Sequence, residues 1–307
     1  MGEAARVLVL GHGAVGCAME RLLGARHGVT AWDRDLDTGE ETVELESVAA
    51  DPDFILFAVP ANPHRELARR VAAVMPSHCI CLSSAKGLDE DGRAPYQVLA
   101  AELGERGRHG AICGPMIARD LQQGRAGFAM LGTAANEDFA QAAALFAGTP
   151  LALEHSTDEA GVSWAVILKN VYVPLIGAAD ALELGDNVRG FLVCAILSEL
   201  DQLVCRLGGR AGTAYTVAGL GDLVTTATSP ASHHRRIGSD LASGRTDRMA
   251  GSGKYIRSEG VHTLSMIERH GLLPIAEFPL MALMQALLAE PGTAGERLRH
   301  ELEHWGH

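Results

Sequence analysis

Short apolar runs alternate with amphipathic stretches along the first half of the chain. The runs are rich in valine, leucine and isoleucine, which is typical of strands buried on both faces of a parallel sheet. The stretches between them, for example 65–74 and 97–103, repeat their apolar residues at helical spacing. This alternation predicts an α/β fold built on a doubly wound parallel sheet. The seven runs that we predict to be strands are residues 7–10, 29–32, 54–59, 80–83, 110–113, 128–131 and 151–153.

The pattern changes near residue 156. From there apolar positions recur at helical spacing, and glycine-rich breaks separate the runs. A length of 307 residues also exceeds the size at which a single core is usual. We therefore predict a sheet domain at residues 1–154 and an all-α domain at residues 155–307. The helices expected in the second domain span residues 162–178, 191–207, 233–241, 261–270 and 279–288.

A glycine motif follows the first predicted strand and precedes a helical pattern. In the spacing G-x-G-x-x-G, Gly11 permits a tight turn, Gly13 lets a pyrophosphate approach the backbone, and Gly16 lets helix and strand pack closely. A helix that begins here directs free N–H groups and its positive dipole end at phosphates. This context predicts a Rossmann dinucleotide-binding domain. The loop residues that we predict to bind the cofactor are Gly11, His12, Gly13, Ala14, Val15 and Gly16.

The choice between NAD and NADP depends on two neighbouring residues. Asp33 ends the second predicted strand, where a carboxylate bonds the ribose 2′-OH and repels a 2′-phosphate. Arg34 follows it and offers a fork for that phosphate. The two pull in opposite directions, and we favour NADP slightly. Pro60, Lys86 and Pro115 each follow a predicted strand, at the edge where such sheets bind ligands, and we predict that Pro60 binds the cofactor.

Composition narrows the class of partner. A net charge of -12 argues against nucleic acid, because phosphate backbones are bound by clustered lysine and arginine. The most apolar helical run, 162–177, is short for a bilayer span and is interrupted by polar residues, so no membrane partner is expected. The six cysteines lack metal-binding spacing, and no secretory signal precedes the first strand. We expect a reduced, cytoplasmic protein.

Two segments of the second half carry candidate chemistry. Lys169 and Asn170 interrupt an otherwise apolar helical run. Such a lysine either extends to the surface along a buried stem or faces a cleft, where burial and neighbouring charges let it exchange protons. The segment 219–229 holds Asp222 and several hydroxyl groups. Asp222 fits a helix N-cap, a partner for Lys169, or both.

Taken together, the motifs resemble those of the NAD(P)-dependent glycerol-3-phosphate dehydrogenases, within the 6-phosphogluconate-dehydrogenase-like group. Their order and spacing match over nearly the whole chain. Besides the glycine loop, they are DFILFAVP at 53–60, SAKGL at 84–88, Gly114-Pro115, LKN at 168–170, GDN at 185–187, GLGDLV at 219–224, RRIG at 235–238 and EGV at 259–261.

The resemblance implies a Rossmann domain followed by an all-α domain, with the active site in the cleft between them. It implies that Lys169 is the catalytic general acid and base and that Lys86 is a second lysine at the substrate. By the same resemblance, Asn170, Asp222 and Thr226 line the substrate. Arg257 and Glu259 fall where the family contacts the cofactor.

Some residues depart from the family pattern. Where the family has Ser-Arg-Asn-Arg-Arg, whose first Arg and Asn grip the substrate phosphate, this chain has SHHRR at 232–236. Histidine is partly protonated near neutrality and holds a phosphate less firmly than arginine, so we expect His233 and His234 to form an altered anion site. Alternatively, Arg235 shifts register and restores the usual site. Met116 replaces an asparagine of the expected pocket wall.

We therefore predict an NAD(P)-dependent oxidoreductase that interconverts a ketone and a secondary alcohol on a small phosphate- or phosphonate-bearing substrate. Glycerol 3-phosphate with dihydroxyacetone phosphate is one candidate pair, and an analogous keto-phosphonate or keto-acid is the alternative. A non-catalytic dinucleotide sensor is a third reading, although it needs neither Lys169 nor Asp222. No metal site is expected, and a homodimer is compatible with the sequence.

Overall fold

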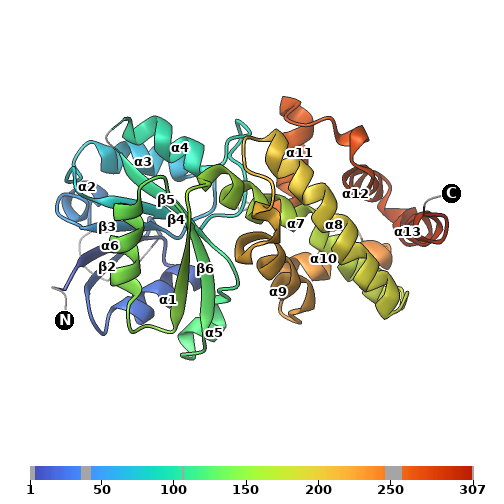
Figure 1. The fold of residues 1–307 in the computed structure, drawn as a ribbon, viewed down its shortest axis with the longest axis horizontal. Coiled ribbons are helices and arrows are strands. Elements are labelled where there is room, and N and C mark those ends of the chain that lie inside the picture. Colours follow the sequence, from blue (N-terminus) through green and yellow to red (C-terminus); the bar gives the residue numbers. More distant parts are fainter. Residues whose placement is uncertain (1–3, 36–42, 106, 246–257, 306–307) are drawn as a thin grey trace. The chain divides into compact units, whose positions relative to one another are not determined.

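The computed structural model describes residues 4–35, 43–105, 107–245 and 258–305. The chain divides into two compact units, Met1–Ser163 and Trp164–His307. The first contains a seven-stranded sheet, and the described residues of the second form helices only (Figure 1). The division lies inside α7 (Glu159–Ala181), whereas the boundary predicted at 154/155 lies inside the last strand, β7 (Leu151–Ser156).

All seven predicted strands are present in the first unit. Their order in the sheet is β2-β1-β3-β4-β5-β6-β7, so the chain reverses its direction of winding between β1 and β3. Ligands of doubly wound sheets bind beyond the carboxyl ends of the strands at such a switch point. Besides β7, the strands are β1 (Arg6–Leu10), β2 (Gly28–Trp32), β3 (Phe54–Phe57), β4 (Ile80–Ser83), β5 (Arg108–Cys113) and β6 (Gly127–Gly132).

One strand pair differs from the predicted parallel sheet. β6 runs antiparallel to β5, and β7 runs parallel to β6. The connection between β5 and β6 contains one short helix, α5 (Ala118–Gln122), instead of the longer helix that usually crosses between parallel strands. The predicted doubly wound sheet is confirmed as a mostly parallel one, and the pair β5–β6 departs from the parallel pattern because this connection returns the chain instead of crossing the sheet.

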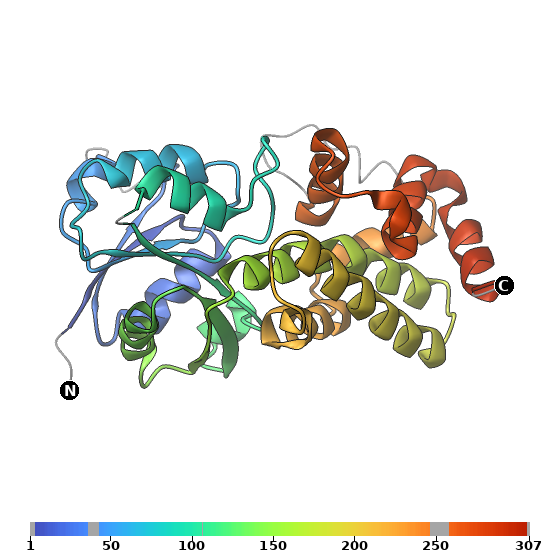
Figure 2. The ribbon, with the colours of Figure 1, turned by 45° about the horizontal axis from the view of Figure 1, so that its top comes forward.

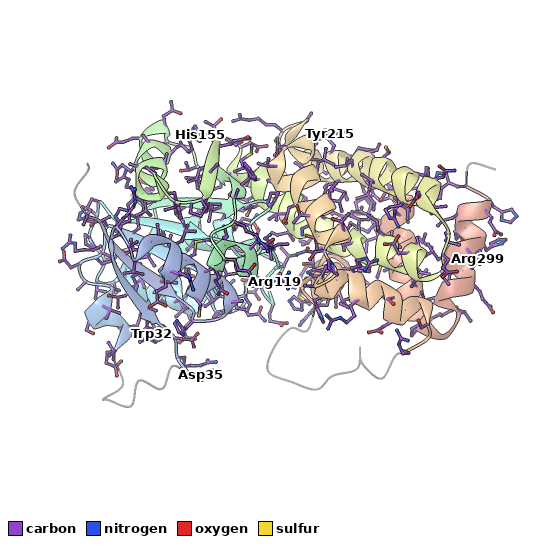
Figure 3. The ribbon with its side chains drawn as sticks, turned by 90° about the horizontal axis from the view of Figure 1, so that it is seen from below. Trp32, Asp35, Arg119, His155, Tyr215 and Arg299 are labelled. Carbon is purple, nitrogen blue, oxygen red and sulfur yellow. The ribbon has the colours of Figure 1, made fainter. Side chains whose placement is uncertain are left out.

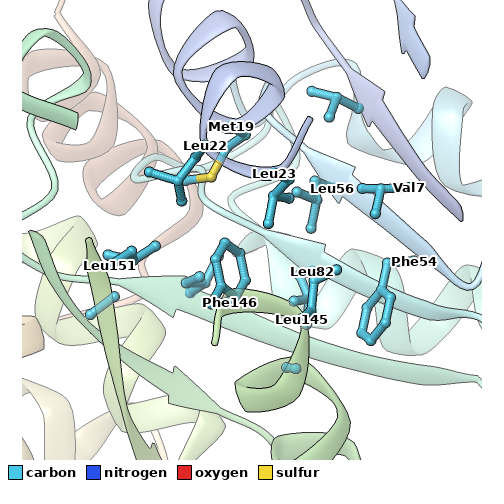
Figure 4. Packing of buried hydrophobic residues seen from close by; sticks show 14 of the residues in the cluster. Val7, Met19, Leu22, Leu23, Phe54, Leu56, Leu82, Leu145, Phe146 and Leu151 are labelled. Carbon is cyan, nitrogen blue, oxygen red and sulfur yellow. The ribbon is translucent and has the colours of Figure 1, made fainter. Parts of the chain in front are cut away.

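Helices cover both faces of the sheet, as doubly wound topology requires (Figure 2). Because successive strand residues point to opposite faces, Val7 and Val9 of β1 join one apolar cluster and Leu8 and Leu10 join the other. Figure 4 shows the first cluster, in which Met19, Leu22 and Leu23 of one helix pack on the strands. With α5, this face carries α1 (Ala14–Leu23) and α6 (Asn136–Phe146), and the other carries α2 (Leu45–Val48), α3 (His64–Ala72) and α4 (Pro95–Leu103).

In the second unit, helices pack closely on α7 through glycines. A Cβ added to Gly238 or Gly260 meets a backbone oxygen of α7 at 1.9 or 2.1 Å, so only glycine permits these crossings. The helices of this unit besides α7 are α8 (Asp186–Arg206), α9 (Asp222–Thr228), α10 (His233–Ala242), α11 (Glu259–His270), α12 (Pro279–Ala289) and α13 (Ala294–Glu303). Short helical turns, η1 (Thr213–Tyr215), η2 (Val217–Gly221), η3 (Ile275–Glu277) and η4 (Pro291–Thr293), connect several of them.

α7 is longer than the sequence pattern predicted. With 23 residues it is long and apolar enough to cross a membrane by length and composition. The predicted length of residues 162–177, which argued against a membrane-spanning helix, was therefore too short. Its apolar window is, however, entirely buried inside the protein. Such burial is that of a central core helix.

Candidate active site

The glycine loop has the geometry that its spacing predicts. Gly11 has φ +98°, and a Cβ there meets the oxygen of Ala58 at 2.7 Å. A Cβ on Gly16 lies 1.9 Å from the oxygen of Gly11, so helix α1 and the loop touch without room for a side chain. Gly13 differs: no atom of the described residues lies within 4 Å of its Cβ position, and the residue is exposed. The first and third glycines are needed by the fold, and the second leaves an open cradle.

This cradle fits a dinucleotide pyrophosphate. Gly13 is the N-cap of α1, and within the described residues no side chain caps that helix end. The first turn contains no acidic residue, and Ala14 is exposed. Uncapped N–H groups at a helix N-terminus favour an anion, and the helix dipole adds to the attraction.

The residues expected to select the cofactor lie where β2 ends, which Figure 3 marks with Trp32 and Asp35. The carboxylate of Asp33 accepts hydrogen bonds from the backbone N–H of His12 at 2.7 Å and of Asp35 at 3.0 Å. Asp33 therefore ties the glycine loop to the end of β2. The Arg34 side chain is 76% exposed, and its ion pair with Asp35 is long, at 3.8 Å.

Three further predicted residues follow strands in the first unit. Pro60 is exposed after β3, and Lys86 is half-buried after β4. Met116, after β5, is only 9% exposed and belongs to the apolar cluster beneath α1. Its side chain therefore packs into the core of the domain.

The candidate catalytic lysine is buried in an ion pair. Lys169 of α7 is 1% exposed, and its Nζ lies 2.9 Å from Oδ2 of Asp222 on α9. Nζ also donates to Oγ1 of Thr226, which donates in turn to the backbone oxygen of Asp222 at 2.6 Å. The hypothesis that Lys169 extends to the surface along a buried stem was wrong.

The local chain geometry explains how α9 presents this pair. Asp222 and Thr226 are four residues apart and lie on one face of the helix. The preceding turn η2 is a π-helix, a wider turn that often occurs at functional sites. Asp222 is the first helical residue, whereas Gly221 is the N-cap, so the interpretation of Asp222 as a capping residue was wrong. Its carboxylate pairs with Lys169 instead.

The beginning of α11 is close to the same part of α7. Asn170 is 1% exposed, and a Cβ on Gly260 lies 2.1 Å from its backbone oxygen. This contact brings the half-buried Glu259 to the region of Lys169. Arg257, the other residue expected at the cofactor, lies outside the described residues.

At the altered phosphate segment, α10 begins with His233. The His233 side chain is exposed and His234 is half-buried. The Arg235 guanidinium faces Asp180 of α7, to which it donates at 3.3 and 3.1 Å. Arg189 donates to the same carboxylate at 2.9 and 2.7 Å. A move of Arg235 to the substrate therefore requires it to leave Asp180, a partner that the sequence analysis missed because it lies 55 residues away.

No group of three or more potential metal ligands occurs among the residues that the structure describes.

The chain is similar to known proteins over most of its length. Family models described as the N-terminus and C-terminus of NAD-dependent glycerol-3-phosphate dehydrogenase match residues 37–139 and 158–296. A glycerol-3-phosphate dehydrogenase [NAD(P)+] of Teredinibacter turnerae is 30% identical over 292 residues, covering 87% of this chain and 86% of that protein. One of Pseudomonas aeruginosa is 27% identical and covers 96% of this chain and 94% of that protein.

The fold is also that of solved structures. A glycerol-3-phosphate dehydrogenase from Coxiella burnetii superposes with a TM-score of 0.84 at 24% identity, covering 98% of this chain and 99% of that one. The two family matches, the bacterial relatives and the geometry of the glycine loop agree. The chain belongs to the NAD-dependent glycerol-3-phosphate dehydrogenase family.

Proposed function

We propose that this protein interconverts dihydroxyacetone phosphate and glycerol 3-phosphate, with Lys169 as general acid and base. As a member of its family it is an NAD(P)-dependent oxidoreductase that acts on a CH–OH group. The observation that carries the catalytic assignment is the Lys169–Asp222 pair, in which both side chains are nearly completely buried. Burying two charges costs desolvation energy that apolar side chains avoid, so such a pair is weak as a stabilising device.

The arrangement suits proton transfer to a developing alkoxide. When bound, the nicotinamide supplies or accepts the hydride. Lys169 donates its proton to the carbonyl oxygen during reduction and removes the hydroxyl proton in the reverse direction. Asp222 stabilises the ammonium form between turnovers, and Thr226 fixes the direction of Nζ through its own bond to the backbone of α9. A positioned cation of this kind also stabilises negative charge on the oxygen.

The first unit is proposed to hold the cofactor. The open position beside Gly13 and the uncapped end of α1 fit the pyrophosphate. Asp33 is engaged with the N–H of His12, whereas the exposed Arg34 is available to a 2′-phosphate once its weak pair with Asp35 is broken. This difference supports the slight preference for NADP. Cytoplasmic location and dimerisation stay predictions.

One observation favours a second candidate substrate, an analogous keto-phosphonate. The family's Arg-Asn pair is replaced by His233 and His234, and the next arginine, Arg235, is bound to Asp180. An imidazole gives one donor per ring nitrogen and is only partly charged near neutrality. Such a site suits an anion of different length or orientation from a phosphate ester.

A substrate panel tests these candidates. Oxidation of NADPH and NADH is followed with dihydroxyacetone phosphate, small keto-phosphonates and small keto-acids. A kcat/KM above about 10⁵ M⁻¹s⁻¹ for dihydroxyacetone phosphate, in the usual range of efficient enzymes, supports the main proposal. A much higher value for a keto-phosphonate supports the second candidate. If the dinucleotide binds and no ketone is turned over, both candidate activities are excluded, and the hypothesis of a non-catalytic dinucleotide sensor is supported.

A further inference from the structure

A buried histidine of the first unit has no part in the proposed reaction. His64 is the first residue of α3 and is completely buried. Its ring stacks on Phe57 at 5.2 Å between centroids. Nδ1 lies 2.9 Å from the backbone oxygen of Pro60, and Nε2 lies 2.8 Å from Oγ of Ser83, at the end of β4.

These contacts determine which ring nitrogen carries the proton. The carbonyl of Pro60 only accepts, so Nδ1 donates to it and Nε2 accepts from the hydroxyl of Ser83. Burial lowers the pKa of His64 to about 4, so the ring is neutral at pH 7. Oγ of Ser83 then accepts the backbone N–H of Ala85 at 3.3 Å. One continuous chain of hydrogen bonds thus runs from Pro60 to the residue that precedes Lys86.

The two segments joined in this way end neighbouring strands. β3 and β4 pair in parallel with Phe57 opposite Ser83, so the segments carrying Pro60 and Lys86 leave the same edge of the sheet. Pro60 is predicted from the sequence to bind the cofactor, and Lys86 is the second lysine that the resemblance implies at the substrate. The link therefore spans the two groups of ligand contacts within this domain.

Packing alone does not explain a polar link at this place. Both His64 and Ser83 are at most 2% exposed, and burying an imidazole and a hydroxyl costs free energy unless each is hydrogen-bonded. A phenylalanine and an alanine fill comparable space without that cost. What the polar pair adds is direction, because it holds two loop ends at a set separation.

We propose that His64 is a positioning residue, which through Ser83 holds Lys86 in line with the substrate anion and holds the Pro60 turn against the dinucleotide. The proposal rests on the proposed function. The side chain touches neither ligand and acts by preorganising the residues that do, which reduces the cost of ordering them on binding.

The test uses Ser83→Ala and His64→Phe in the full-length protein. Ser83→Ala removes the hydroxyl that joins His64 to Ala85 and leaves the bond between His64 and Pro60 in place. We expect it to raise the substrate KM about tenfold, with kcat changed less than about threefold. His64→Phe keeps the aromatic stack but loses both bonds, and we expect it also to weaken dinucleotide binding about tenfold, measured by fluorescence titration. Thr133→Val is the matched control, because it removes another buried hydroxyl, just after β6, that is bonded to the backbone of His109.

A double-mutant cycle separates positioning from simple destabilisation. If His64 and Ser83 act through Lys86, Ser83→Ala has little further effect on KM in a Lys86→Met background. An equal effect in both backgrounds, or the same KM change in Thr133→Val, overturns the proposal.

The dinucleotide titration distinguishes this outcome from failure of the proposed function. If wild type turns over no ketone, dinucleotide affinity alone decides the matter. A roughly tenfold loss in His64→Phe then supports positioning of the Pro60 turn, and unchanged affinity overturns it.

Discussion

The two units build their candidate sites from different parts of the chain. In the first, the backbone carries the features that matter: a positive φ at Gly11, open space at Gly13 and uncapped N–H groups at the start of α1. These features lie within a few consecutive residues. In the second, side chains carry them, and Lys169 meets Thr226 across 57 residues of sequence.

The difference also concerns charge. The glycine loop offers neutral dipoles, which need no compensating partner when no anion is bound. Lys169 and Asp222 are opposite charges in a buried environment, and each depends on the other. Removing one partner of such a pair leaves an uncompensated buried charge. We therefore expect the first site to tolerate substitutions that alter neither its backbone nor the open space beside Gly13, and the second to be sensitive to single side chains.

The largest expected effect is that of Lys169→Met. The variant loses the proton donor, and we expect kcat to fall by about 10²–10⁴ while dinucleotide affinity stays near that of wild type. Steady-state kinetics and a dinucleotide titration measure the two quantities. Thr225→Val is the control on α9, because that hydroxyl bonds Gly221 and not the lysine. Unchanged turnover in Lys169→Met would falsify the assignment.

The second-largest expected effects are those of alanine substitutions at two glycines of the G-x-G-x-x-G motif. A Cβ at position 16 lies 1.9 Å from the oxygen of Gly11, so we expect Gly16→Ala to lower the free energy of unfolding by about 1–3 kcal/mol or more. Gly13→Ala meets open space and an ordinary extended backbone, with φ -75°. It should unfold like wild type and bind dinucleotide at least about tenfold more weakly. Denaturant unfolding measures the stability of both variants, and a dinucleotide titration measures their affinity. If Gly13→Ala binds the dinucleotide as tightly as wild type, the open position beside Gly13 does not hold the pyrophosphate.

A third prediction concerns pH and His64. The pKa of this group is about 4 in the folded protein against an ordinary 6.5. Because the unfolded chain binds the proton more readily, the contribution of His64 to stability is complete above pH 6.5 and is lost as the pH falls towards 4. From pH 7 to 4.5 this loss is about 2 kcal/mol.

The measurement is the free energy of unfolding at both pH values in wild type and His64→Phe. Other groups titrate equally in the two proteins, so the variant should show a pH dependence smaller by about 2 kcal/mol. Identical pH dependence in both proteins is the contrary result.

The smallest expected effect is that of Arg34→Ala on the preference for NADPH over NADH. Arg34→Ala should lower the ratio of kcat/KM for NADPH over NADH about tenfold, because an exposed charge-assisted bond to the 2′-phosphate is lost. Arg21→Ala, an exposed arginine in the last turn of α1, is the control. A wild type that favours NADH, with a ratio unmoved by Arg34→Ala, refutes the preference for NADP.

The strands were predictable because each is a short apolar run with its own boundaries. The direction in which strands pair was less predictable. β6 returns antiparallel to β5 because of how the segment with the short α5 folds, and the spacing of apolar residues does not indicate that path. Similarly, an apolar helix with one lysine is compatible with surface or core. Only the approach of α9 decided that Lys169 is buried against a carboxylate.

Local spacing by itself determined the glycine loop, the seven strands and the change to helices after the sheet. These features depend on residues that are close in sequence, where backbone sterics and side-chain periodicity act directly. The tertiary structure alone decided that Asp222 pairs with Lys169, that Asp180 holds Arg235, and that His64 joins two strand ends. Each of these contacts joins distant residues, and its energy exists only once packing has removed water from around the charges and dipoles involved.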